Sequence, residues 1–115
     1  MALSELEARR ITKAVDPFVQ KRRPAPHIRP KLDIGFRISG QSVEIFEIRP
    51  AWKRPDEIHE HPVAKATFVK TRAVWKVFWL RADLKWHSYS PTPTVGTVEK
   101  FLALVEADPH ACFWG

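Results

Sequence analysis

Basic and aromatic side chains alternate in the segment from Val74 to Tyr89, which reads VWKVFWLRADLKWHSY. Successive side chains of a strand point to opposite faces, so one face of such a segment collects every second residue. Lysines neutralise phosphates and aromatic rings stack on bases, which suits a single-stranded nucleic acid; an ordinary solvated sheet face is the alternative. With the preceding segment included, the residues that we expect on this face are Lys65, Lys76, Phe78, Lys85, His87 and Tyr89.

A basic stretch near the N-terminus, KRRPAPHIRPK over residues 21–31, adds further positive charge. Its three prolines prevent a helix and its five Lys and Arg residues prevent burial, so it reads as a stiff and exposed connector. We expect Arg22 and Arg23 to extend the binding surface electrostatically.

Two pairs of metal-ligating residues, His59 with His61 and His110 with Cys112, have donor types that suit zinc. The pairs lie far apart in the sequence and neither has the spacing of a zinc finger, whereas loop histidines are usually just solvated. We therefore expect no metal site and no cofactor.

A divalent-metal nuclease is the enzymatic alternative, because Asp33 followed by Glu47-Ile48-Arg49 imitates an Asp on one strand and an acid-x-Lys on the next. Arg49 stands where such enzymes have lysine, and a two-residue hairpin loop would turn Asp33 and Glu47 to opposite faces unless a bulge intervenes. A Gly-x-Ser-x-Gly turn is missing from the sequence. These departures favour a non-enzymatic protein.

Size and charge set the remaining bounds. The 115 residues suffice for one core, and a net charge of +6 with a pI near 9.8 favours polyanionic partners such as nucleic acid. The single cysteine, Cys112, excludes an internal disulfide and fits a reducing compartment. The N-terminus lacks a signal-peptide pattern, and the longest aliphatic-aromatic run, Val77 to Leu80, is too short to cross a bilayer. We expect a cytoplasmic protein.

A hairpin from Val74 to Tyr89 and a strand before it, Val63 to Lys70, are predicted in the middle of the chain. A two-residue loop at Ala82-Asp83 would set Trp79 against Trp86, so that Trp75, Trp79 and Trp86 share one face. A two-residue turn at Thr71-Arg72 would place small residues of the preceding strand opposite large ones, as close packing requires. The pairs that this turn predicts are Phe68 with Trp75, Ala66 with Val77 and Ala64 with Trp79.

An earlier hairpin is predicted from two alternating segments, residues 32–38 and 43–48. A loop of Ser39-Gly40 or of Gly40-Gln41 places Phe36 and Ile38 beside Val43 or Ile45 in either case. Prolines and charges predict a loop from Pro50 to Pro62.

Helices are predicted at both ends of the chain. Ser4 with Glu7 forms a capping-box pattern, and the helix that it begins should kink or restart at Pro17. A second helix should follow a Thr94 or Thr97 cap, end at Asp108-Pro109, and leave an apolar tail that folds back or docks on another copy. Its apolar stripe consists of Val98, Phe101, Leu102 and Val105.

These elements predict one α+β domain over residues 1–115 with two layers. A five-stranded, mainly antiparallel sheet of two hairpins plus a strand would carry both terminal helices on its tryptophan face. The helix and connector would occupy residues 1–31, the sheet residues 32–90, and the last helix and tail residues 91–115.

Four strings, EIFEIRPAW, HPVAKATFVK, WKVFWLRADLKWHSY and DPHACFWG, carry a resemblance to a known family. Over roughly Val43 to Gly115 the chain resembles the bacterial family DUF3024, a domain of unknown function. The resemblance implies no activity, cofactor or site residue.

The sequence therefore favours a non-enzymatic module that binds nucleic acid or another polyanion. Two alternatives stay open: the nuclease, and a protein-interaction domain that uses Phe113-Trp114 and an open sheet edge and forms a homo-oligomer.

Overall fold

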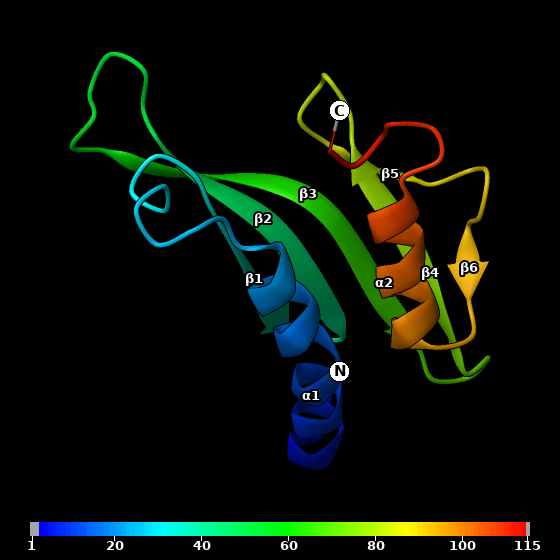
Figure 1. Ribbon diagram of the computed structural model, residues 1–115. Coiled ribbons are helices and arrows are strands. Elements are labelled where there is room, and N and C mark those ends of the chain that lie inside the picture. Colours follow the sequence, from blue (N-terminus) through cyan, green and yellow to red (C-terminus); the bar gives the residue numbers. More distant parts are fainter. Residues whose placement is uncertain (1–2, 115) are drawn as a thin grey trace.

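The computed structural model describes residues 3–114 and contains one antiparallel sheet covered by two helices (Figure 1). In the described residues the sheet has six strands in the order β1-β2-β3-β4-β5, and β6 also pairs with β4. The fold is thus the predicted α+β arrangement with one additional short strand. Its elements are α1 (Glu5–Arg22), β1 (Asp33–Ser39), β2 (Ser42–Pro50), β3 (Ile58–Val69), β4 (Val74–Leu80), β5 (Trp86–Ser88), β6 (Thr94–Val95) and α2 (Val98–Ala107).

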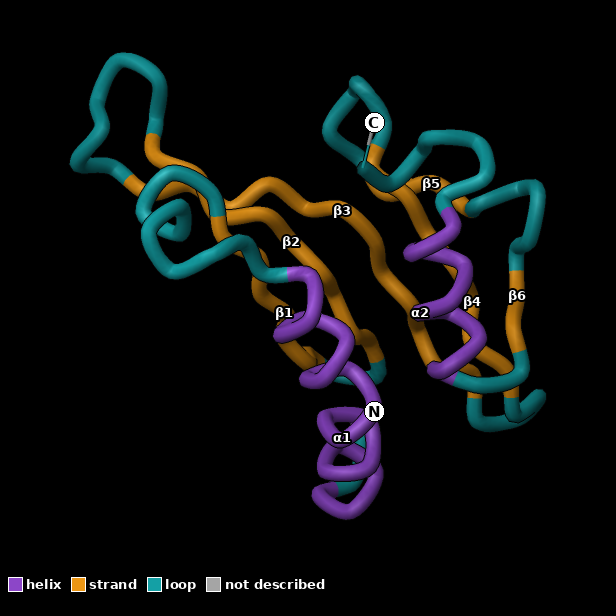
Figure 2. The backbone as a smooth tube through the Cα atoms, in the orientation of Figure 1, coloured by secondary structure: helices purple, strands orange, loops and turns teal. Residues whose placement is uncertain are grey.

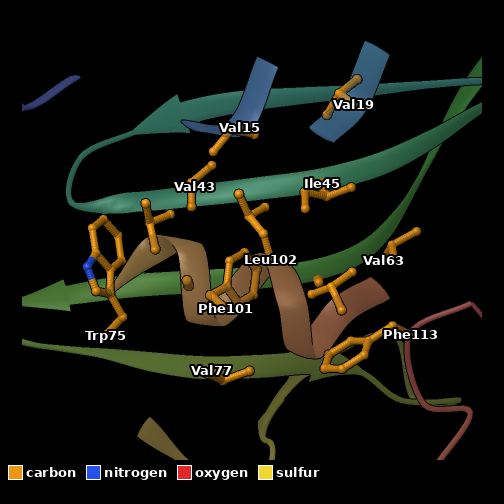
Figure 3. Packing of buried hydrophobic residues seen from close by; sticks show 14 of the residues in the cluster. Val15, Val19, Val43, Ile45, Val63, Trp75, Val77, Phe101, Leu102 and Phe113 are labelled. Carbon is orange, nitrogen blue, oxygen red and sulfur yellow. The ribbon is translucent and has the colours of Figure 1, made fainter. Parts of the chain in front are cut away.

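Both helices lie on the same face of the sheet, with α1 over β1 and β2 and α2 over β3 and β4 (Figures 1 and 2). The core between the two layers contains Val15 and Val19 of α1, and the predicted stripe of α2 is buried in full (Figure 3). Trp75 and Val77 face this core from β4. The other face of the sheet is covered by neither helix, and we call it the outer face.

Helix α1 begins at the predicted capping box. The Ser4 Oγ accepts from the Glu7 amide at 3.1 Å, and the Glu7 carboxylate accepts from the Ser4 amide at 3.0 Å. Of the two possibilities predicted at Pro17, the stop and restart of the helix is wrong, because α1 continues through Pro17 to Arg22. Pro17 and Lys13 are both exposed, so water can solvate the Lys13 carbonyl that a proline leaves without a donor.

The first hairpin uses the Gly40-Gln41 loop, one of the two predicted. Ser39 pairs with Ser42, and Gly40 has a φ of 60°, which glycine adopts at little cost. Phe36 lies opposite Ile45 and Ile38 opposite Val43, as this loop requires.

Strands β2 and β3 extend further than predicted and form a projecting ribbon (Figures 1 and 2). The predicted loop from Pro50 to Pro62 is too long, because Ile58 already pairs with Pro50. The register shifts between Ile45 and Phe46, so that Phe46 pairs with Pro62 while Val63 is bulged. A bulge is where a strand accommodates proline, which has no amide hydrogen to donate. We call residues 49–59 the arm.

The register between β3 and β4 is the predicted one. Ala64 pairs with Trp79 and Phe68 with Trp75, although the turn spans residues 70–73 and Ala73 adopts a φ of 52°. The small side chain of Ala64 leaves room for the indole opposite it.

The register between β4 and β5 differs from the prediction by one residue. Trp86 pairs with Leu80 rather than Trp79, because the loop has three residues and ends with Leu84 at a φ of 62°. The Asp83 carboxylate stabilises this loop by accepting from the Lys85 amide at 3.0 Å. A shift of one residue turns a strand over, so Trp86 lies on the outer face and not with Trp75 and Trp79.

Helix α2 is capped by Thr97, and the tail that follows it folds back onto the domain. Asp108 adopts a left-handed φ of 39°, and its carboxylate accepts from the amides of Cys112, Phe113 and Trp114 at 2.9, 3.1 and 3.0 Å. Phe113 is buried against Tyr89, with ring centroids 4.8 Å apart. The tail was predicted either to fold back or to dock on another copy, and in the structure it folds back.

Candidate functional site

The outer face is the surface on which charge and aromatic side chains come together. Pairing and strand alternation place on it one residue in two from each strand of the sheet. Its members with charged, aromatic or large apolar side chains are Asp33, Arg37, Glu44, Phe46, Ile48, Ile58, Glu60, Lys65, Lys76, Phe78, Leu80 and Trp86.

Lys65 stands between two aromatic rings at the centre of this face. Its Nζ lies 5.0 Å from the Phe78 ring centroid and 5.1 Å from that of Trp86. All three side chains are half-buried, so each presents part of its surface to solvent. The ammonium group is attracted to the ring faces, and the arrangement holds a cation beside two stacking surfaces.

A second cation and ring lie on β1 and β2. The Arg37 guanidinium is 4.5 Å from the Phe46 ring centroid and also forms an ion pair with Glu60. The Phe46 ring covers Gly35, where an added Cβ would approach the Phe46 Cε2 to 2.9 Å. Glycine at this position therefore lets the ring lie flat on the backbone.

Two further lysines predicted for the site lie in different elements. Lys76 is exposed on the outer face in β4, opposite Thr67, and Lys85 is exposed in the loop before β5. Glu44 pairs across the strands with Lys65 and offsets one positive charge.

Tyr89 and His87 do not lie on the outer face, contrary to the prediction, because the β4–β5 register shifts by one residue. Tyr89 is fully buried against Phe113, and burial raises the pKa of its phenol. Its hydroxyl has no hydrogen-bond partner among the described residues. His87 pairs with Trp79, and its Nε2 lies 2.8 Å from the Asp83 carboxylate, a contact that lowers the pKa of Asp83.

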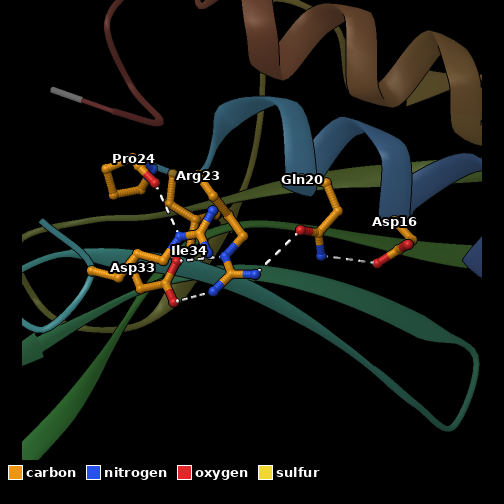
Figure 4. A network of polar contacts seen from close by, with 7 residues as sticks. Asp16, Gln20, Arg23, Pro24, Asp33 and Ile34 are labelled. Carbon is orange, nitrogen blue, oxygen red and sulfur yellow. Dashed lines mark hydrogen bonds and ion pairs between the residues drawn. The ribbon is translucent and has the colours of Figure 1, made fainter. Parts of the chain in front are cut away.

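Arg22 and Arg23 make contacts within the chain rather than forming the free extension that was predicted. The Arg23 Nε and Nη2 donate to the two Asp33 carboxylate oxygens at 2.8 and 2.9 Å, and Gln20 accepts from the same guanidinium (Figure 4). This bidentate contact with Arg23 lowers the pKa of Asp33. Arg22 lies 3.9 Å from the Trp114 ring centroid.

The residues of the nuclease pattern are not brought together. Asp33 pairs with Ile48 and Glu47 with Ile34, so the register turns the two carboxylates to opposite faces, and the bulge near Phe46 lies on β3 instead. Asp33 is held by Arg23, and Glu47 accepts from Arg49 at 3.2 Å.

The two metal-ligand pairs also stay separate. His59 and His61 belong to β3, where the arm joins the body, whereas His110 and Cys112 belong to the tail after α2. Within the described part of the chain, no three His, Cys, Asp or Glu residues are placed to hold a metal ion. Burial, with a smaller effect of Asp108, raises the pKa of the Cys112 thiol.

Sequence reasoning missed Trp86 and the pair of Arg37 and Phe46 on this face. The sequence did indicate the pair, because strand alternation turns Arg37 away from the face of Ile38 and Phe46 away from the face of Ile45. For Trp86 the signal was absent, because a non-glycine residue such as Leu84 gives no hint of a left-handed conformation.

Comparison with known proteins gives one match. The family described as Domain of unknown function (DUF3024) matches residues 3–115. No curated protein and no solved structure matches the chain. In residues 3–114, no helix combines the length and the apolar character needed to cross a membrane.

Proposed function

The chain belongs to the DUF3024 family of domains of unknown function, and we propose that its outer face binds single-stranded nucleic acid.

The observation that carries the proposal is the position of Lys65 between Phe78 and Trp86, with Nζ 5.0 and 5.1 Å from the two ring centroids. Bases stack on aromatic faces, and phosphates are neutralised by ammonium groups. In the bound state a base replaces the ammonium group on one ring, and the flexible lysine stem swings its charge to the adjoining phosphate.

The surrounding charges support an anionic ligand. Lys76 is exposed on the same face, Arg37 lies on β1, and the whole chain has a net charge of +6. Glu44 and Glu60 lie beside Lys65 and Arg37, which keeps the attraction moderate. Because stacking is open to every base, we expect binding with little sequence preference.

The test is fluorescence anisotropy of a labelled mixed-sequence single strand over a series of salt concentrations. We expect affinity to fall with salt, with a log-log slope of roughly −2 if about three phosphates are neutralised. A duplex of the same sequence should bind more weakly because its bases are not available for stacking. An affinity independent of salt would contradict phosphate contact.

Two substitutions locate the binding surface. Trp86→Ala should weaken binding by about tenfold, since one stacked base contributes roughly 1–3 kcal/mol. Lys76→Glu should weaken binding and flatten the salt dependence. The matched control is Lys13→Glu, because Lys13 is exposed on α1, which covers the opposite side of the sheet. Equal losses for Lys13→Glu and Lys76→Glu would show attraction to overall charge and would reject the outer face as the site.

A further inference from the structure

The tip of the arm exposes large apolar side chains. Trp52 is 88% exposed and Ile58 59% exposed, and both lie on a ribbon that projects from the body (Figure 1). Lys53 lies 5.6 Å from the Trp52 ring centroid, with Arg54 next in the chain. Exposed tryptophan flanked by cations is the composition of a protein-interaction anchor, since Trp and Arg dominate binding energy at interfaces.

A cleft of about 250 Å³ lies at the other end of β3, between the starts of α1 and α2. Phe68 and Trp75 contribute aromatic side chains to its lining, with ring centroids 5.1 Å apart. Its charged lining residues are Glu7, Arg10 and Glu99. The volume is below the roughly 300–1,000 Å³ of small-molecule sites, and it suits one large side chain.

We propose that the arm of one copy docks in this cleft of a second copy, with Trp52 against Phe68 and Trp75. Strand β3 joins the two features, since Ile58 begins it and Phe68 lies near its end. Ten residues of strand span roughly 33 Å, so an arm cannot reach the cleft of its own chain. If two copies lie side by side with their β3 strands running in opposite directions, each arm reaches the cleft of the other copy. The result is a dimer with two-fold symmetry, in which both arms and both clefts are occupied.

Opposite charges on the arm and in the cleft determine which side chains pair around the Trp52 indole. Glu7 already lies 4.0 Å from Lys70, and Arg54 lies 3.3 Å from Glu57 of its own arm. No such ion pair is found among the described residues for Lys53 of the arm or for Glu99 of the cleft, and Glu99 is exposed. The interface therefore pairs Lys53 with Glu99 of the second copy, while Arg10 stands at the rim and opposes a second cation.

Sedimentation equilibrium over a concentration series tests the proposal on the full chain. We expect the wild type to dimerise and Trp52→Ala to weaken the dimer at least about thirty-fold, as the loss of an anchor residue does. Leu84→Ala is the matched control, because Leu84 is 79% exposed at the tip of another loop. Glu99→Gln should weaken the dimer and reduce its sensitivity to salt.

A mixing experiment distinguishes docking from general stickiness. Gly96 lines the cleft, and a Cβ there meets no atom within 4 Å, so Gly96→Leu adds a bulky side chain at the cleft without a clash and leaves the arm intact. Trp52→Ala has an intact cleft and Gly96→Leu an intact arm, so each alone should be monomeric and the mixture should form a heterodimer. Circular dichroism checks that both variants fold.

A wild type that is monomeric at every concentration would overturn the proposal. So would a dimer that Trp52→Ala leaves unchanged, or a mixture that remains monomeric. The proposal is independent of nucleic-acid binding, because Trp52 and Gly96 lie outside the outer face.

Discussion

The ion pair between Arg23 and Asp33 joins the C-terminal end of α1 to the edge strand β1. Both side chains are largely shielded, with 25% and 18% of their surfaces exposed. Asp33 also accepts from the Ile34 amide at 2.8 Å, so the carboxylate is satisfied by three donors. The same residue that a nuclease would need for a metal thus serves to position a helix.

The ion pair predicts how stability changes with pH. Contact with Arg23 lowers the pKa of Asp33 below its ordinary value of 3.8, so its contribution is complete above pH 3.8 and is lost as pH falls further. Asp33→Asn should lower the free energy of unfolding at neutral pH by about 1–2 kcal/mol, and the difference from wild type should shrink below pH 4. Urea unfolding at several pH values measures it.

The exposed Asp56 provides the control, because it lies in the arm loop. Asp56→Asn should have little effect at any pH. A deficit of Asp33→Asn that stays constant down to pH 2 would mean that the charge of Asp33 is not what stabilises the fold.

At the level of single residues, much of the register could be predicted, but the face of Trp86 could not. The size match of Ala64 with Trp79 fixed the register between β3 and β4 correctly. Between β4 and β5, two-residue and three-residue loops both fit the pattern of apolar side chains. The choice depends on Leu84 accepting a φ of 62° in a loop that the Asp83 carboxylate stabilises, a local conformation that the residue types do not reveal.

At the level of elements, the tail is held by the end of α2. The Asp108 carboxylate accepts from three successive amides, and the Trp114 indole donates to the Val105 carbonyl at 2.9 Å. Arg22 of α1 covers the same indole, so the tail links the two helices.

Removal of the Asp108 carboxylate should release the tail. Asp108→Ala loses all three of these hydrogen bonds and a residue type that tolerates left-handed backbone, so we expect a loss of about 2–3 kcal/mol in unfolding free energy. Asp108→Asn keeps one acceptor oxygen and the backbone preference and should lose less. Hydrogen exchange of residues 112–114 is the measurement, and protection equal to wild type in Asp108→Ala would refute the assignment.

Proline was an unreliable guide to where the elements end. Pro17 lies within α1 and Pro62 within β3, although both were expected to limit regular structure. Each is accommodated by a local arrangement, an exposed carbonyl for Pro17 and a bulge for Pro62. In contrast, the cap at Ser4 and the stripe of α2 were predicted correctly, and Thr97 was one of the two caps predicted for α2, because these features depend on the sequence within a few residues.

For the whole molecule, both helices share one core with the sheet, and Phe101 lies at its centre and is fully buried (Figure 3). Phe101→Ala should cost about 3–5 kcal/mol through lost burial and the cavity that remains. A domain of this size has only about 5–15 kcal/mol of stability, so a large shift of the urea midpoint is expected. Leu104→Ala on the half-buried side of α2 should cost less, and an equal loss would argue against the packing described.

The two-layer arrangement was predictable because each helix and each hairpin had one apolar side to bury. The projecting arm was not, because most of its residues are exposed and their pattern carries no burial signal. Exposed segments that pack against no core are therefore the part of this fold that sequence periodicity does not reveal.

The five tryptophans occupy different parts of the molecule. Trp52 is at the arm tip, Trp75 and Trp79 are on the helix side of β4, Trp86 is on the outer face, and Trp114 is in the tail. Variants that keep one indole and replace the others with phenylalanine would turn the chain into a set of site-specific optical probes. Emission wavelength and quenching would then report separately on the arm, the interior, the sheet surface and the tail without an added dye.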